Sequence, residues 1–206
     1  MLVCIVVYFV LMSSKRSQRP PASLPQTVMI FSSFGISNSF RPTCWFVGSN
    51  AHAEWFVPDV SGRLADIVIA IEPGYARKGQ EQTAGDLNLF LATDENGFPG
   101  KILEQFSLTA GAPTSAPPLL PLVFKSASQP ELMSGAKFWL CAKSSGMEGW
   151  VWHFGDPKMV RKAAREKAPG MWASAGDFCY CAAFSVNVIT NQALPGIASG
   201  NALNNY

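Results

Sequence analysis

The chain has 206 residues and a formal net charge of +2, from 16 Lys and Arg against 14 Asp and Glu. Charged residues make up 15% of the chain and apolar residues 48%, which is too apolar and too weakly charged for a disordered protein. The basic excess of a nucleic-acid-binding protein is missing, and no apolar run reaches the ~18 residues of a membrane-spanning helix. We therefore predict one globular domain with no nucleic-acid partner and no stable membrane span.

The run from Met1 to Met12 is apolar throughout, and three cations follow it. A secretory signal carries its cations before the apolar stretch, so this run is an atypical export signal, and we expect the protein to be secreted or at the cell surface. Two alternatives stay open. Translation starts at Met12 or Met29, or the run is a buried strand, because Val, Ile, Tyr and Phe favour strands.

From residue 28 onward, short segments in which apolar residues alternate with other residues are separated by turn residues, a pattern typical of strands. These segments are residues 63–72, 86–92, 102–108, 119–124, 137–143 and 180–188. In the third segment, period-2 spacing places Ile102, Glu104, Phe106 and Leu108 on one face. We expect these strands to pair with one another in antiparallel sheets.

This series of strands predicts an all-β fold, a single-domain antiparallel β-sandwich of the jelly-roll type. The sandwich is expected over residues 28–190. Residues 1–27 are expected to form an apolar head and a Ser/Pro/basic linker, and residues 191–206 a flexible C-terminal tail. A proline-rich extended loop or edge is expected at 110–121.

A tight turn is predicted between the strands at 86–92 and 102–108. Asn96 and Gly97 supply the positive-φ positions that a two-residue hairpin requires. We expect Pro99 and Gly100, which follow, to prevent immediate re-pairing of the two strands.

One basic segment, residues 158–168, holds helix formers throughout and is followed by Pro169-Gly170. It predicts about three turns of helix, with a charged excursion between strands as the alternative. Its cations are Lys158, Arg161, Lys162, Arg165 and Lys167. On a helix, the first four follow i, i+3, i+4, i+7 spacing and share a face. That face is either solvated or the contact for an anionic surface.

Several segments carry a family resemblance. Residues 94–104, DENGFPGKILE, resemble a hallmark of bacterial choice-of-anchor R domains, in which an L-x-L-x-x-D strand leads into a G-x-P-G-x-x-L hairpin. Residues 132–140, LMSGAKFWL, are similar to the L-x-x-G-x-x-Y-W-L strand of that family, with Phe138 in place of Tyr. Shorter matches lie at 34–35, 38–40, 44–49, 53–58, 149–152 and 183–186.

The resemblance covers about 34–189 and implies an exported or surface-anchored bacterial β-sandwich. The family has no established activity, so the resemblance implies no catalytic residues. Its members often end in an L-P-x-T-G sorting signal, whereas residues 194–198 read LPGIA and lack the Thr. The resemblance therefore does not extend to a C-terminal anchor.

The five cysteines are Cys4, Cys44, Cys141, Cys179 and Cys181. Because the number is odd, at least one is unpaired in a monomer. Our first interpretation is buried thiols, and the alternative is a disulfide of Cys141 with Cys179 or Cys181, which fits an exported protein. His52 and His153 are the only histidines and have no finger-like spacing, so we expect no metal site and no cofactor.

The segment 150–156, WVWHFGD, is the richest local cluster of aromatic and polar residues. On a strand, Trp150 and Trp152 share one face and His153 lies on the other. One interpretation is a platform that stacks on sugar rings, with His153 and Asp156 at its edge and Trp172 extending it. The alternative is that the aromatic rings fill the core between the sheets. These five residues are the candidate ligand-binding residues.

The acid–base candidates are His52, Glu54, His153 and Asp156, but the sequence holds neither a G-x-S-x-G nor an H-E-x-x-H motif. We predict no catalytic residues and a protein that is not an enzyme. The expected function is that of a non-catalytic exported or surface-associated module, with weak glycan binding or adhesion. The alternatives are a structural subunit of an envelope or phage assembly and, third, a hydrolase. The expected partner is a glycan or an envelope component.

Overall fold

The computed structural model describes residues 24–34, 41–73, 85–109, 121–145, 149–156, 161–178 and 181–191. Within these ranges the chain forms strands and turns but no helix. The strands are β1 (Gln26–Ser32), β2 (Arg41–Val47), β3 (His52–Phe56), β4 (Gly62–Ile69), β5 (Ile71–Pro73), β6 (Leu87–Glu95), β7 (Phe98–Leu108), β8 (Leu122–Lys125), β9 (Glu131–Leu132), β10 (Phe138–Ser144), β11 (Trp150–Phe154), β12 (Arg161–Ala168), β13 (Met171–Phe178) and β14 (Phe184–Thr190). The all-β prediction is confirmed.

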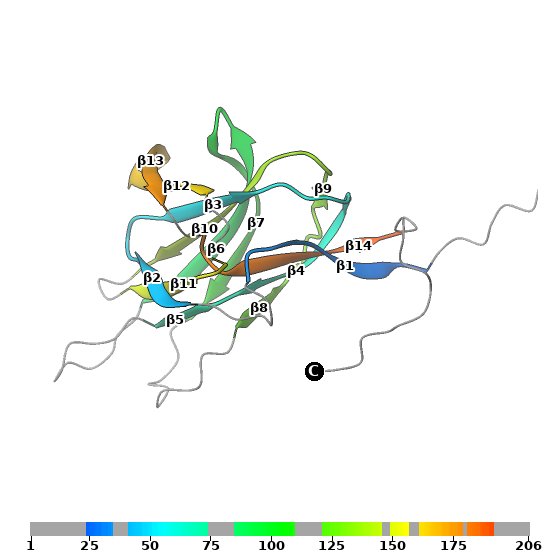
Figure 1. Ribbon diagram of the computed structural model, residues 1–206, viewed down its shortest axis with the longest axis horizontal. Coiled ribbons are helices and arrows are strands. Elements are labelled where there is room, and N and C mark those ends of the chain that lie inside the picture. The colour runs from blue at the N-terminus through cyan, green and yellow to red at the C-terminus, as the bar shows by residue number, and fades with distance from the viewer. Residues whose placement is uncertain are drawn as a thin grey trace, which may run out of the picture. The chain divides into compact units, whose positions relative to one another are not determined.

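The described strands pair into three antiparallel sheets (Figure 1). The first has the order β1-β14-β4-β8, and β9 also pairs with β4. The second has the order β13-β12-β3-β10-β6-β7, and the third β2-β11-β5. In the first sheet, the first and last strands of the sandwich are neighbours, with Gln26 opposite Thr190 and Ser32 opposite Ser185.

The main core lies between the first and second sheets. On β6, Leu87, Leu89 and Leu91 are fully buried, as their alternation predicts. Phe31 of β1 meets Phe56 of β3 with ring centroids 5.5 Å apart. Because each such apolar side chain contributes roughly 1.5–3 kcal/mol when it leaves water, contacts of this kind hold the two sheets together. Residues Pro25–Thr190 form one compact unit, and the chain is a single-domain antiparallel β-sandwich.

The predicted alternation also holds near the C-terminal end of the sandwich. Ala182, Phe184, Val186 and Val188 are all fully buried in the main core. A fifth residue predicted for this face, Tyr180, lies outside the described residues, as do residues 1–23, 110–120 and 192–206. The predictions made for those segments therefore stay predictions.

A second, smaller cluster lies on the other face of the six-stranded sheet. Its buried members are Ala53, Ala92, Trp139, Cys141 and Ala164. The partly buried rings that cover them are Trp55, Phe90, Phe98 and Trp172. The sheet is therefore apolar on both faces, which explains why β10 reads as a continuous hydrophobic run rather than an alternating one.

A close backbone crossing joins the first and third sheets. The Gly155 amide donates to the Cys181 carbonyl at 2.8 Å, and the Asp156 amide donates to the Ser33 carbonyl at 2.7 Å. The Ser33 hydroxyl donates to the Ala182 carbonyl and accepts from the Phe184 amide at 2.8 Å. A Cβ at Gly155 would lie 1.8 Å from the Ser33 carbonyl oxygen, so only glycine fits at this crossing.

A carboxylate clamp ties β7 to the segment between β8 and β9. Glu104 accepts from the hydroxyl of Ser126 and from the amides of Ala127 at 2.7 Å and Ser128 at 3.0 Å. Burial raises the pKa of the Glu104 carboxyl, but these hydrogen bonds outweigh burial and leave that pKa below its ordinary value. The clamp therefore depends on the ionised carboxylate.

The predicted hairpin turn is present, but one expectation about it is wrong. Asn96 and Gly97 have φ values of 53° and 86°, as a two-residue turn demands. Pairing does not lapse at Pro99, which lies opposite Asp94. A bulge follows immediately, in which Gly100 and Lys101 together lie opposite Thr93 and the Lys101 amide donates to the Thr93 hydroxyl at 3.1 Å.

A second bulge overturns the predicted face of β7. Leu91 pairs with Glu104 and Ala92 with Ile102, so Leu103 is an extra residue. The bulge turns Ile102 outward, where it is 50% exposed, and Leu103 packs against the main core instead. The plain period-2 count placed Ile102 and Glu104 on one face, and this prediction is wrong.

Two further elements differ from the sequence-based expectation. The strand expected at 63–72 is divided at Ala70, where the chain passes from β4 in the first sheet to β5 in the third. The helix expected at 158–168 is wrong, because residues 161–168 form β12, paired with β3 on one side and β13 on the other. Hydrogen bonding along both edges outweighs the helix propensity of Lys, Ala, Arg and Glu, which is worth less than ~1 kcal/mol per residue.

The described residues contain no helix long and apolar enough to cross a membrane.

Candidate functional site

An open depression of about 470 Å³ lies where β12 and β13 meet the start of β3. Its volume is within the ~300–1,000 Å³ range of small-molecule sites. The lining residues are Asn50, His52, Arg165, Glu166, Lys167, Ala173, Ser174 and Ala175. The charged lining residues come from β12, and the small ones, Ala173, Ser174 and Ala175, come from β13 and leave the space open.

The strand register explains how these residues meet. Arg165 of β12 lies opposite His52 of β3 on one side and opposite Ala173 of β13 on the other. The β12–β13 pairing contains two bulges, in which Lys167 on one strand and Ala175 on the other are the extra residues. Bulges re-aim side chains and are common beside functional sites, and both extra residues line the depression.

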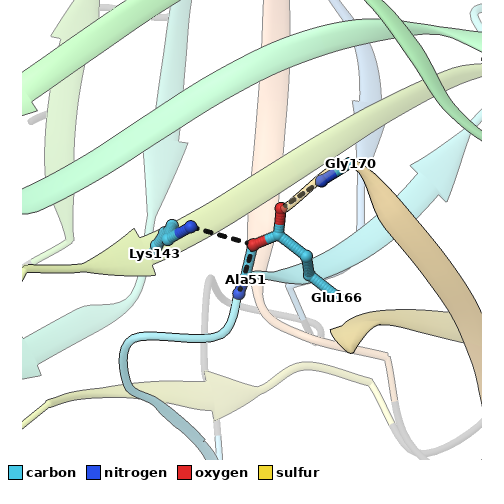
Figure 2. A network of polar contacts seen from close by, with 4 residues as sticks. All are labelled: Ala51, Lys143, Glu166 and Gly170. Carbon is cyan, nitrogen blue, oxygen red and sulfur yellow. Dashed lines mark hydrogen bonds and ion pairs between the residues drawn. The ribbon is translucent and has the colours of Figure 1, made fainter. Parts of the chain in front are cut away.

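Glu166 fixes the hairpin that carries the depression (Figure 2). Its carboxylate accepts from the Gly170 amide at 2.9 Å, from the Lys143 ammonium of β10 at 2.9 Å and from the Ala51 amide at 3.5 Å. Gly170 has a φ of 74°, so the turn after β12 needs both the glycine and this bond. The carboxylate thereby ties the turn to β10 and to the residue that precedes β3.

Glu166 is ionised in this network. Burial acts to raise the pKa of its carboxyl, but the bond from Gly170 and the bond and positive charge of Lys143 outweigh it, with a smaller contribution from Ala51. The pKa of Glu166 therefore lies below its ordinary value. The negative charge at the rim of the depression is directed at Lys143.

His52 at the depression is neutral near pH 7. Burial disfavours its charged form, and the positive charge of Arg165 adds to this, so the pKa of His52 falls from 6.5 to about 4. The cationic character of the site therefore comes from Arg165 and Lys167, both exposed.

The structure places two of the five predicted ligand-binding residues in the core. Trp150 is 3% exposed and Trp152 is fully buried, and their indole N–H groups donate to the carbonyls of Gly85 at 2.8 Å and Ala183 at 3.2 Å. Both rings fill the core, which was the alternative interpretation. Ligand binding through them stays a prediction, with no exposed ring face at these positions to support it.

The other three predicted residues lie in different surroundings. His153 is 3% exposed and pairs with Glu72 of β5, with 3.0 Å between Nε2 and Oε1. Asp156 is held by its amide at the backbone crossing. Trp172 is partly buried against the second cluster, next to Ala173 of the depression. The structure does not bring the five together into one site.

The four acid–base candidates do not gather in one site, because His52 and Glu54 lie two residues apart on β3, whereas His153 and Asp156 lie on or just after β11. His52 faces Arg165, whereas Glu54, 2% exposed, accepts from the Cys181 thiol at 3.8 Å. His153 has Glu72 as its partner, a pairing that no local sequence signal indicated because 81 residues separate the two. Among the described residues, no three His, Cys, Asp or Glu side chains gather to hold a metal ion.

The cysteine prediction is resolved for two residues. Cys141 and Cys181 are free buried thiols, and they lie in the second and the main cluster respectively. Because Cys141 is free, the predicted disulfide of Cys141 with Cys179 or Cys181 is wrong, and buried thiols are confirmed for these two residues. Burial, with a smaller effect of Glu166, raises the pKa of the Cys141 thiol.

Sequence reasoning named Arg165 and Lys167 only among the cations of residues 158–168, with Lys167 outside the predicted cationic face, and did not single out Asn50 or Ser174. A strand reading of 161–168 would have placed Arg165 and Lys167, two apart, on one face. No protein-family model matches the chain, and no curated protein matches it. The resemblance to choice-of-anchor R domains stays a prediction.

Proposed function

We propose that the protein is a non-catalytic β-sandwich module of the cell surface or extracellular space that binds glycans. The observation that carries this proposal is the depression beside β12 and β13, whose volume of about 470 Å³ suits a small ligand. Its lining offers the amide of Asn50 and the hydroxyl of Ser174, groups that both donate and accept hydrogen bonds. Sugar hydroxyls need partners of this kind.

The arrangement also favours binding over chemistry. His52 lies opposite Arg165, and its lowered pKa leaves it neutral and weakly basic. The carboxylate at the rim, Glu166, already accepts hydrogen bonds from the Gly170 amide in the turn and from the Lys143 ammonium. The small side chains of Ala173 and Ala175 leave room for a ligand between the charged groups.

A glycan array followed by isothermal titration calorimetry on the full chain tests the proposal. We expect at least one class of glycan to bind and the variant Ser174→Trp, which fills the depression from an exposed position on an edge strand, to abolish that binding. Gln105→Trp is the matched control, because it makes a similar exchange at an exposed position on the opposite edge strand, β7. The absence of any glycan ligand, or equal loss in both variants, would overturn the proposal.

A further inference from the structure

The depression carries positive charge that the described parts of the protein leave uncompensated. Arg165 and Lys167 both line it, and neither forms a salt bridge or a side-chain hydrogen bond with any described residue. Of the other described cations, Lys125, Lys137 and Lys143 each pair with a carboxylate, whereas the exposed Arg63 and Lys101 form no salt bridge with a described residue either. The two cations of the depression are therefore available to a ligand.

The negative charge nearest to these cations is directed elsewhere. One carboxylate oxygen of Glu166 accepts from Gly170, and the other accepts from Lys143 and Ala51. These bonds orient the carboxylate along the hairpin turn and toward β10 (Figure 2). Glu166 therefore shapes the site, while Lys143 neutralises its charge.

The backbone presents the two cations together. Arg165 lies between the two bulges of the β12–β13 hairpin, and Lys167 is itself the extra residue of one bulge. With regular pairing, Lys167 and Ala175 would not be extra residues and would not be re-aimed by the bulges. The floor beside them consists of Ala173, Ser174 and Ala175, so small side chains leave an oxyanion access to both cations.

We propose that the ligand of this depression is an anionic sugar, whose carboxylate or sulfate group is bound by Arg165 and Lys167. This inference rests on the proposed glycan-binding function and names the class of ligand. Carboxylate and sulfate are oxyanions that match the planar fork of an arginine side chain. Asn50, Ser174 and neutral His52 are then left for the sugar hydroxyls.

Titration calorimetry with three matched probes tests the inference: oligogalacturonate, which carries only carboxylates; a chondroitin sulfate oligosaccharide, which carries sulfates as well; and a neutral cello-oligosaccharide. We expect one or both acidic probes to bind at least about tenfold more tightly than the neutral one. The comparison of the first two probes tells which oxyanion is preferred. Affinity should fall as the NaCl concentration rises from 50 to 300 mM, on the order expected for screened charges.

Two double variants with the same net charge distinguish binding at the depression from attraction of the acidic probe by the overall charge of the protein. Arg165→Gln/Lys167→Gln removes the cations of the depression and should weaken binding of the acidic probe about tenfold or more. Arg63→Gln/Lys101→Gln removes two cations at exposed positions on β4 and β7 and should change it less than about twofold. Thermal unfolding of both variants checks that they fold.

The outcomes distinguish this inference from the function on which it rests. Equal binding of neutral and acidic probes would overturn the anionic ligand and leave glycan binding in place. Binding of no probe and no array glycan would overturn the proposed function itself. Equal weakening in both double variants would show that net charge, not the depression, attracts the acidic probes, and would also overturn the inference.

Discussion

Gly155→Ala is the substitution that most directly tests the backbone crossing between the first and third sheets. The new Cβ would stand 1.8 Å from the carbonyl oxygen and 2.8 Å from the carbonyl carbon of Ser33. Both are backbone atoms, so no side-chain rotation relieves the clash. The two segments must separate by more than an ångström to reach ordinary van der Waals contact.

Separation costs more than the clash alone. It lengthens the 2.7 Å bond from the Asp156 amide to the Ser33 carbonyl and the 2.8 Å bond from the Phe184 amide to the Ser33 hydroxyl. Overpacking costs roughly 1–3 kcal/mol, and a buried polar group left without its partner costs about 1–3 kcal/mol. The sum predicts a loss of about 2–6 kcal/mol, a large fraction of the ~5–15 kcal/mol that stabilises a typical domain.

Urea unfolding at pH 7, followed by tryptophan fluorescence, measures the loss, because Trp150 and Trp152 are buried in the core. The midpoint should fall at an unchanged m-value, and the thermal midpoint should fall by about 10 °C, at roughly 2–4 °C per kcal/mol. Gly97→Ala is the matched control. Its Cβ meets nothing within 4 Å, although its φ of 86° is unfavourable for alanine, so it should cost only ~1 kcal/mol.

A loss below that of the Gly97→Ala control would refute this reasoning. It would mean that the two backbone segments can move apart at the crossing at little cost, despite the close approach of Gly155 to Ser33. A loss accompanied by a changed m-value would mean that the substitution altered the compactness of one of the states instead.

Three further predictions concern titratable groups. Because the folded pKa of Glu104 is lowered, its contribution to stability is present above its unfolded pKa and is lost as pH falls through the folded value; Glu104→Gln should therefore cost about 1–3 kcal/mol at pH 7 in urea unfolding, and progressively less as the pH is lowered through the folded pKa. His52 has a folded pKa of about 4 and therefore binds fewer protons in the folded than in the unfolded state between pH 6.5 and 4. The free energy of unfolding should fall by up to roughly 3 kcal/mol as the pH is lowered across this range. An undiminished pH slope in His52→Gln would contradict this. Cys141 and Cys181, both buried, should resist iodoacetamide in the native protein and react in urea, and peptide mass spectrometry showing rapid native labelling would refute their burial.

Much of the fold follows from the sequence because period-2 spacing is a local signal. The leucines of β6 alternate in the chain and are all buried in the structure, and the turn at Asn96-Gly97 is determined by its own two residues. Bulges are a different matter. Leu103, Lys167 and Ala175 become extra residues only through the strand opposite, so no local pattern predicts them.

The site was harder to predict than the fold for the same reason. Residues 158–168 have helix-forming composition, and only pairing with β3 and β13 makes 161–168 a strand. Helical spacing left Lys167 apart from Arg165, although the depression contains both. Likewise, the partners of the Trp150 and Trp152 indoles are carbonyls 65 and 31 residues away, so the sequence could not distinguish a core role from a platform.

The pairing of β1 with β14 has a consequence for how such a sandwich is deployed. Gln26 and Thr190 face each other across one ladder, so the chain enters and leaves the sandwich at adjacent points. A unit with this geometry can be inserted into a surface loop of a host protein without prising the host apart, and it tolerates circular permutation. A tether at either end would hold the sandwich from the same point.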